Sequence, residues 1–158
     1  MLTNHQYGLV LFNKYKRISE SMPYVEEGVK ILSNTLETLV DDNLQEKFSQ
    51  HNYFLELIDK LTIQALILLI DNKNWPEQLN LSPSGRHVLG QAIVEDWYIQ
   101  FVLEYNEKSG RQLEVQLLEL AVRELYSNGL FTIYQDGGGH SVVLTVQGVS
   151  LLTYLSDK

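Results

Sequence analysis

The stretch from Asn128 to Leu152, NGLFTIYQDGGGHSVVLTVQGVSLL, constrains the fold of this chain most strongly. Two runs of β-branched and aromatic residues, 130–134 and 142–145, flank the turn-forming residues 135–140. This pattern predicts a β-hairpin. Elsewhere the apolar residues follow the three- and four-residue spacing of helices. We therefore predict a mainly α protein of the α+β type, with a helical N-terminal half followed by a unit that contains one β-hairpin.

Three helices are predicted in the N-terminal half. A capping-box pattern begins the first at Thr3, and Pro23 marks the start of the second. Asp42 and Asn43 can cap a third helix, which either runs unbroken to Asp71 or bends near residues 49–52, where helix propensity is poor. The second helix carries a stripe of apolar residues on one face: Val25, Val29, Leu32, Leu36, Leu39 and Val40.

Residues 72–84 form the main irregular connection, because they hold two prolines and several asparagines. A fourth helix follows from Ser84 to about Glu107, and a fifth runs from Arg111 to Asn128. Gly129 supplies the left-handed residue that closes the fifth helix. The length of 158 residues fits a single domain, 1–158, with a helical part at 1–72 and a second part at 84–158.

The second part follows the order helix, glycine-containing turn, helix, hairpin, which is that of a winged helix-turn-helix. Its sequence also resembles the C-terminal part of MarR-like and PadR-like bacterial regulators. The matching residues are Leu125 before Asn128-Gly129-Leu130, Asp136 in the turn, then Leu144-Thr145 and Gly148 before Leu151-Leu152. The resemblance implies a winged-helix-like unit at 84–158 that binds operator DNA as a dimer, with its second helix in the major groove and its hairpin against phosphates.

The charges of the chain oppose binding to operator DNA. The formal net charge is −8, and no lysine or arginine occurs between Glu124 and Asp157. Phosphate contacts, which supply much of the affinity for DNA, come largely from such cations. MarR-like wings typically place an arginine after the aspartate, whereas here Asp136 precedes three glycines and His140, mostly neutral at pH 7. A protein–protein interaction or regulatory module is therefore predicted, with a DNA-binding transcriptional regulator as the alternative.

The predicted fifth helix presents few groups that could read bases. Its polar strip is Gln116, Glu119, Arg123 and Ser127, and the Glu119–Arg123 spacing allows an ion pair. The apolar arc is so wide that we expect burial on more than one side, as in a core or dimer helix. The candidate nucleic-acid or partner contacts are Arg111, Gln116, Glu119, Arg123, Ser127 and His140.

Two further features are candidates for a partner surface. The basic cluster Lys14, Lys16 and Arg17 is either a solvated helix end or a contact with a phosphate or a partner. Trp75 either folds back onto the core or is displayed to a partner. The long apolar helices predict a homodimer, so the expected partner is a second copy or another protein.

Other chemistry has little support. The four histidines show no metal-ligand spacing, and His87, Gln91 and Glu95 form only a polar strip. Glu95 and Asp96 point about 100° apart on a helix, so they cannot jointly flank a substrate. No nucleophile motif occurs. We predict no catalytic residue, no metal and no cofactor.

The compartment is predicted from what the chain lacks. It contains no cysteine, and residues 1–17 show no signal-peptide pattern. The apolar run 61–70 is about half the length needed to cross a bilayer. A cytoplasmic protein without membrane contact is expected.

Overall fold

The computed structural model describes residues 4–23, 25–41, 46–79, 90–111, 113–136 and 139–156. The chain divides into two compact units: a helical unit, Met1–Ile67 with Ser150–Lys158, and a sheet unit, Leu68–Val149. The chain passes between them within two helices, α4 (Ile63–Ile70) and α8 (Val146–Leu155). Within the described residues, helices predominate over one small antiparallel sheet, so the predicted mainly α, α+β class is confirmed.

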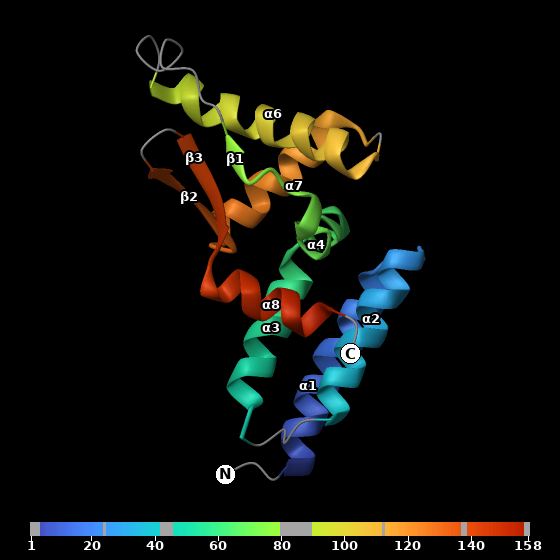
Figure 1. Ribbon diagram of the computed structural model, residues 1–158. Helices are drawn as coiled ribbons and strands as arrows, with labels where there is room; N and C mark the ends of the chain where they lie inside the picture. The colour runs from blue at the N-terminus through green and yellow to red at the C-terminus, as the bar shows by residue number, and fades with distance from the viewer. Residues whose placement is uncertain are drawn as a thin grey trace. The chain divides into compact units, whose positions relative to one another are not determined.

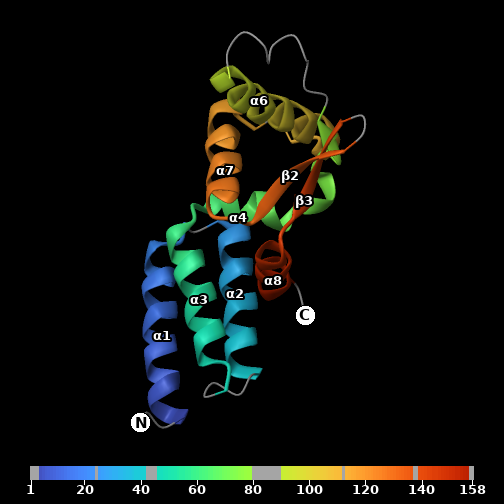
Figure 2. The ribbon, with the colours of Figure 1, turned by 90° about the vertical axis from the view of Figure 1, so that its left-hand side faces the viewer.

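In the helical unit, α1 (Asn4–Ser21), α2 (Glu26–Asp41) and α3 (Phe48–Lys60) run alongside one another (Figure 2). The Tyr15 hydroxyl of α1 donates a 3.0 Å hydrogen bond to the Leu32 carbonyl of α2. Burial follows the apolar spacing that predicted these helices. The buried apolar residues of the unit include Leu11, Ile18, Ile31, Leu39, Phe54, Leu55, Ile58, Leu66, Leu151 and Leu155.

Polar contacts connect the last turn of α8 to other helices of the helical unit. The Asn34 side-chain amide donates a 2.9 Å hydrogen bond to the Leu155 carbonyl, and His51 Nδ1 lies 2.9 Å from the Tyr154 hydroxyl. Asn34 and His51 are both buried. A carbonyl in the last turn of a helix has no partner within the helix, so the amide of Asn34 satisfies a group that burial would otherwise leave unpaired.

The third predicted helix breaks at a place that the sequence analysis did not identify. It continues through residues 49–52 and ends at Lys60, and α4 begins at Ile63. Leu61 between them is extended, with φ −82° and ψ 143°. The Thr62 hydroxyl accepts a hydrogen bond from the Ala65 amide at 3.3 Å, so it caps the new helix. The predicted caps Asp42 and Asn43 lie outside the described residues.

The sheet unit joins helices to a three-stranded sheet (Figure 1). In chain order it contains the end of α4, the 3₁₀ turn η1 (Asn72–Asn74), β1 (Gln78–Leu79), α6 (Gly90–Ser109), α7 (Val115–Ser127), β2 (Phe131–Asp136) and β3 (Gly139–Leu144). The strand order is β1-β3-β2, and both pairings are antiparallel. The hairpin is confirmed, with Ile133 opposite Val142. The short strand β1, in which Leu79 faces His140, was not predicted.

Aromatic rings fill the interior of the sheet unit. Trp75 lies with its ring centroid 5.4 Å from that of Phe101 in α6 and 5.3 Å from that of Phe131 in β2. Trp97 of α6 lies 5.9 Å from Phe131, edge to face. Such pairs add to the free energy of burying the rings. This cluster joins a residue of the connection after α4 to α6 and the sheet.

Several residues that carry the family resemblance hold the junction between α7, the hairpin and α8. Gly129 has φ +73°, as predicted for the cap of α7. The Thr145 hydroxyl donates to the Gly129 carbonyl at 2.6 Å and accepts from the Gly148 amide at 3.0 Å. A Cβ atom at Gly148 would collide with the Leu130 carbonyl. These residues are therefore explained by packing within the chain.

Candidate interaction interface

Helix α7 is buried on one side by described residues of its own unit. Its buried residues are Leu118, Ala121, Val122 and Leu125, and α7 packs against α6 and β2. The helix begins at Val115, four residues later than predicted, because Glu114 is still extended with ψ 127°. Within this chain the helix has one buried side, and burial of the rest of its apolar arc, as in a dimer helix, stays a prediction. Two apolar residues of that arc, Leu117 and Leu120, are 49% and 63% exposed.

The predicted polar strip does lie on the exposed side of α7. Gln116 and Ser127 are exposed, and Glu119 and Arg123 lie half-buried between them. Arg123 Nη2 donates to Glu119 Oε1 at 2.8 Å, and the Arg123 guanidinium carbon lies 4.6 Å from the centre of the Tyr98 ring. The one arginine of this surface therefore has an anionic partner and an aromatic partner in its own unit.

The pKa of Tyr98 reflects the burial of its ring beneath this polar strip. Burial raises the pKa of its hydroxyl above the ordinary value, and the nearby Arg123 charge opposes that rise. Tyr98 is itself among the buried residues of the core. The Arg123 side chain thus lies over a largely desolvated ring, which limits how far it can reach toward a ligand without losing these contacts.

The hairpin places no cation beside α7. Residues 131–144 contain neither lysine nor arginine. His140 lies in β3, the middle strand, between Leu79 of β1 and Gln135 of β2. Its Nδ1 atom is buried and has no hydrogen-bond partner among the described residues. The side chain of Asp136 and residues 137 and 138 at the hairpin tip lie outside the described residues.

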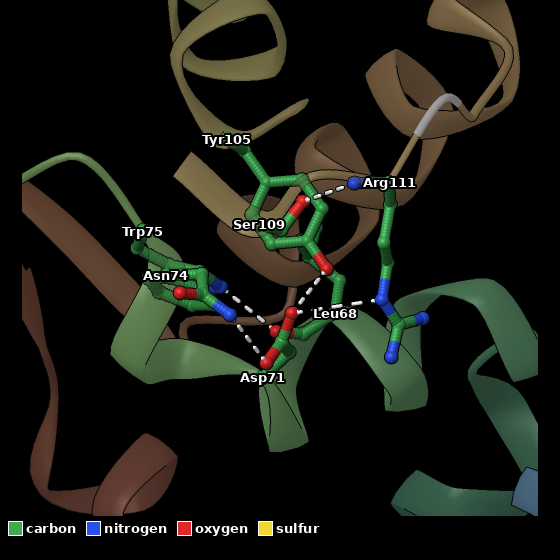
Figure 3. A network of polar contacts seen from close by, with 7 residues as sticks. All are labelled: Leu68, Asp71, Asn74, Trp75, Tyr105, Ser109 and Arg111. Carbon is green, nitrogen blue, oxygen red and sulfur yellow. Dashed lines mark hydrogen bonds and ion pairs between the residues drawn. The ribbon is translucent and has the colours of Figure 1, made fainter. Parts of the chain in front are cut away.

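Arg111 lies beside Asp71, a carboxylate of its own unit (Figure 3). Arg111 Nε lies 3.8 Å from Asp71 Oδ2, and the Tyr105 hydroxyl donates to the same oxygen at 2.7 Å. The Asn74 amide donates to Asp71 Oδ1 at 2.9 Å. The end of α4, the turn η1 and the end of α6 are joined by this one carboxylate. Sequence reasoning missed Asp71, because its partners are 34 and 40 residues away along the chain.

The Asp71 network also affects the titration of Tyr105. Burial and, secondly, the hydrogen bond to the Asp71 carboxylate both raise the pKa of the Tyr105 hydroxyl far above its ordinary value, while the Arg111 charge opposes the rise. Ionisation would place a phenolate against a carboxylate. The geometry is therefore that of a structural junction which keeps Tyr105 protonated.

Trp75 is a core residue. It is 4% exposed, and its indole Nε1 donates to the Leu68 carbonyl at 2.8 Å. Of the two alternatives, the structure shows the one in which the ring folds onto the core. The second alternative, a ring displayed to a partner, is corrected: aromatic neighbours from α6 and β2 enclose the side chain.

The basic cluster on α1 is largely neutralised within the helical unit. Lys14 Nζ lies 2.8 Å from Glu56 Oε1, and this hydrogen bond lowers the pKa of the Glu56 carboxyl. Arg17 Nη2 lies 3.3 Å from Asp59 Oδ2. Lys16 is exposed. Lys14 and Arg17 thus form contacts between α1 and α3, while Arg17 and Lys16 both remain exposed to solvent.

The described surface includes two hollows. One of about 230 Å³ in the sheet unit is lined in part by Lys73, Glu77 and Lys108, and Lys108 Nζ donates to the Trp75 carbonyl at 3.2 Å. One of about 370 Å³ in the helical unit is lined by residues at and just after the end of α1 and by residues around the break between α3 and α4. Within the described ranges, no three His, Asp or Glu side chains lie together in a way that could hold a metal ion. The predicted strip of His87, Gln91 and Glu95, and the pair Glu95 and Asp96, lie outside the residues whose side chains are described.

Searches against protein-family models, curated proteins and solved structures found no match to this chain. Across the described parts of the chain, no helix combines the length and apolar character required to cross a membrane.

Proposed function

We propose that this chain is a winged-helix-like protein–protein interaction module, non-catalytic and active in the cytoplasm, and that the exposed face of α7 is its contact surface. The element order supports the winged-helix part. Helices α6 and α7 are joined through Gly110 at φ +72°, a hairpin follows, and its inner strand β3 also pairs with β1 ahead of the two helices.

The observation that carries the proposal is the composition of the exposed face of α7. Arg123 is paired with Glu119, while Leu117 and Leu120 are half-exposed or more beside it. A DNA-reading helix needs free cations and polar groups that reach base edges. An exposed pair of leucines next to an internally paired charge instead suits a partially apolar protein contact.

The alternative is a DNA-binding transcriptional regulator. It is favoured by the same element order and by the exposed Gln116 and Ser127 on α7. The test is fluorescence anisotropy of labelled duplex DNA, titrated with the protein at low salt. We expect no binding at micromolar protein. The alternative would be established by binding that falls steeply with added salt, strengthens in Glu119→Gln and weakens in Arg123→Ala. Protein cations that neutralise phosphates release counterions from the DNA, so such binding depends on salt and on the charge of Arg123.

A second experiment tests whether the exposed face of α7 contacts another protein. A photo-cross-linking amino acid is introduced at position 120 in cells that express the chain. We expect a discrete cross-linked protein product that disappears when Leu117→Ser is added. The matched control places the same amino acid at Glu20, an exposed residue of α1 in the helical unit. Equal products from both positions, or none from position 120, would contradict the proposed contact surface.

A further inference from the structure

The turn between α7 and β2 (Figure 1) contains the one asparagine of the chain that is followed by glycine, Asn128 before Gly129. Asparagine is a thermolabile residue, because the backbone nitrogen of the next residue can attack its side-chain carbonyl carbon. Glycine has no Cβ atom to hinder that nitrogen. The chain therefore carries its most reactive asparagine at the point where a helix passes into the hairpin.

The reaction of such a pair is ring closure followed by hydrolysis. The Gly129 nitrogen gives up its proton and forms a bond to Cγ of Asn128, the Cγ–Nδ2 bond breaks, and the side-chain nitrogen leaves with a proton as ammonia. Water then opens the five-membered imide at one of its two carbonyl carbons. Opening at Cγ leaves an aspartate, whereas opening at the backbone carbonyl carbon leaves an isoaspartate, in which the main chain runs through Cβ and Cγ.

The folded turn holds this pair away from ring closure. Asn128 has ψ 9°, so the Gly129 nitrogen is nearly eclipsed with the backbone nitrogen of Asn128. Ring closure requires it to be nearly eclipsed with Cβ, which lies about 120° away around the tetrahedral Cα. The Gly129 amide also donates to the Tyr126 carbonyl at 3.0 Å, and Asn128 Nδ2 donates to the Glu124 carbonyl at 2.7 Å. Both reacting groups are therefore engaged in hydrogen bonds that cap the helix.

Further contacts keep the turn in this conformation. Gly129 has φ +73°, and the Leu130 amide donates to the Leu125 carbonyl at 3.0 Å, which together with the Gly129 bond completes a Schellman cap. Leu125 and Leu130 are fully buried. The Thr145 hydroxyl donates to the Gly129 carbonyl at 2.6 Å. Ring closure therefore requires the end of α7 to open, because rotation about ψ of Asn128 breaks these bonds.

We propose that Asn128–Gly129 is a latent deamidation site, closed in the folded turn, whose reaction in the opened turn prevents the cap from forming again. An isoaspartate adds a main-chain atom between the Cα of residue 128 and the nitrogen of Gly129, so the cap bonds to the Tyr126 and Leu125 carbonyls lose their register. An aspartate loses the amide donor to the Glu124 carbonyl and places a negative charge at the C-terminal end of α7, where the helix dipole disfavours it. Both products convert a transient opening into a permanent loss of the cap.

The same turn supports the start of α8. The Leu130 carbonyl accepts the Thr145 amide at 3.1 Å, and a Cβ atom at Gly148 would collide with that carbonyl. A shift of residues 129 and 130 therefore disturbs the close approach of α8 to the turn, and we expect the modified chain to lose stability. This inference does not depend on what the exposed face of α7 contacts.

The experiment incubates the full chain at mildly alkaline pH and follows the tryptic peptide after Arg123, in which Asn128 is the only asparagine. Deamidation changes its mass, because a hydroxyl replaces the amide nitrogen, whereas isomerisation of Asp136 before Gly137 does not. The reference is a synthetic peptide of residues 122–134. We expect the folded chain to react at least about tenfold more slowly, and each tenfold corresponds to about 1.4 kcal/mol of opening free energy. Equal rates in the chain and the peptide would overturn the proposal.

A pair of substitutions tests whether opening of this turn controls the reaction. Thr145→Val removes the hydroxyl that contacts Gly129 and Gly148 and leaves the reacting pair intact, so deamidation of the folded chain should be about tenfold faster. Thr132→Val, at a half-buried threonine of β2, is the matched control and should leave the rate unchanged. Equal rates in both variants would contradict the proposal.

The wild type in urea gives the same comparison without a substitution, should Thr145→Val fail to fold. Its rate should rise toward that of the peptide as the chain opens. A rate independent of urea would show that the folded turn does not protect Asn128.

The products test the loss of the cap. The deamidated chain, separated by ion exchange through its additional negative charge, should unfold at a lower urea concentration than the unmodified chain. Asn128→Asp, which reproduces one product, should do the same. Asn13→Asp adds the same charge at an exposed asparagine of α1 and should have little effect. A deamidated chain as stable as the unmodified one would overturn the proposal, because the cap would then have formed again.

Discussion

The helical unit and the sheet unit are stabilised by different kinds of interior. The helical unit buries mostly aliphatic side chains and satisfies its buried polar groups through bonds such as Asn34 to Leu155. The sheet unit is built around aromatic rings, among them Trp75, Trp97 and Phe131. In the first, helix periodicity already indicates which residues meet. In the sheet unit, the central ring is that of Trp75, which lies in an irregular segment. No sequence periodicity indicates where such a segment packs.

The surfaces of the two units differ in a related way. On α2, the residues beside the core continue the apolar stripe, so exposure there follows from an arc wider than one neighbour can cover. On α7, exposed leucines alternate with an internally paired glutamate and arginine. The exposed stripe of α2 is made of apolar residues, whereas the exposed face of α7 mixes apolar and charged residues.

The largest expected effect breaks the aromatic interior. Trp75→Ala should lower the free energy of unfolding by about 3–5 kcal/mol, because it leaves a large cavity between Phe101 and Phe131. Urea unfolding followed by the fluorescence of Trp97 reports this unit. Trp75→Phe, which keeps a ring but loses the bond to the Leu68 carbonyl, should cost less. A loss below about 1 kcal/mol for Trp75→Ala would refute the central role of this ring.

The second prediction concerns the polar interior of the helical unit. Asn34→Ala should cost about 1–3 kcal/mol, because the Leu155 carbonyl would lose its donor in a buried position. The measurement is urea unfolding followed by far-UV circular dichroism. The matched control is Ser33→Ala at the exposed neighbour, which should change stability by less than about 0.5 kcal/mol. Equal losses in both variants would argue against a specific role for the amide.

The third prediction tests the Asp71 junction. Tyr105→Phe should cost about 1–2 kcal/mol at neutral pH, because Asp71 Oδ2 loses a hydroxyl donor. Tyr134→Phe, on an exposed residue of β2, should have little effect. Both are measured by urea unfolding.

The pH dependence of the same variant sharpens that test. The folded state raises the pKa of Tyr105, so its hydroxyl contributes stability in full below the ordinary pKa of 10.0 and progressively less as the pH rises above it. The stability difference between the wild type and Tyr105→Phe should therefore shrink above pH 10. A difference that grows with pH would show that the phenolate is favoured in the folded state, contrary to this geometry.

The smallest effect is expected at the surface of the helical unit. Arg17→Gln removes the 3.3 Å ion pair with Asp59 and should cost less than about 1 kcal/mol, because the pair is open to solvent and screened by salt. Lys16→Gln on the exposed neighbour is the control. A larger loss, independent of salt, would indicate that α1 and α3 depend on their charges more than on their apolar interface.

Much of the fold was predictable because its signals are local. The hairpin, the mainly α class, the left-handed Gly129 and the exposed polar strip of α7 all follow from spacing within a few residues. The break at Leu61 and Thr62 was not predicted, because the apolar spacing continues across it. Strand β1 was missed for a different reason: two residues carry no pattern, and they are extended because β3 pairs with them.

The candidate contacts were predicted less well than the fold. The Glu119–Arg123 pair follows from an i,i+4 spacing. The partners of Arg111 and Lys14 do not, because Asp71 and Glu56 come from segments 40 and 42 residues away. A cation in the sequence indicates only that a charge exists. Whether that charge is available to a ligand depends on carboxylates brought near it by folding.

By itself, the sequence determined that the hairpin region has no lysine or arginine and that α2 and α7 have wide apolar arcs, since composition and periodicity are properties of the chain. Only the tertiary structure decided that Trp75 is enclosed and that Leu120 and Val29 are not. The physical reason is that a side chain is buried by its neighbours in space, and most of these neighbours are distant along the chain.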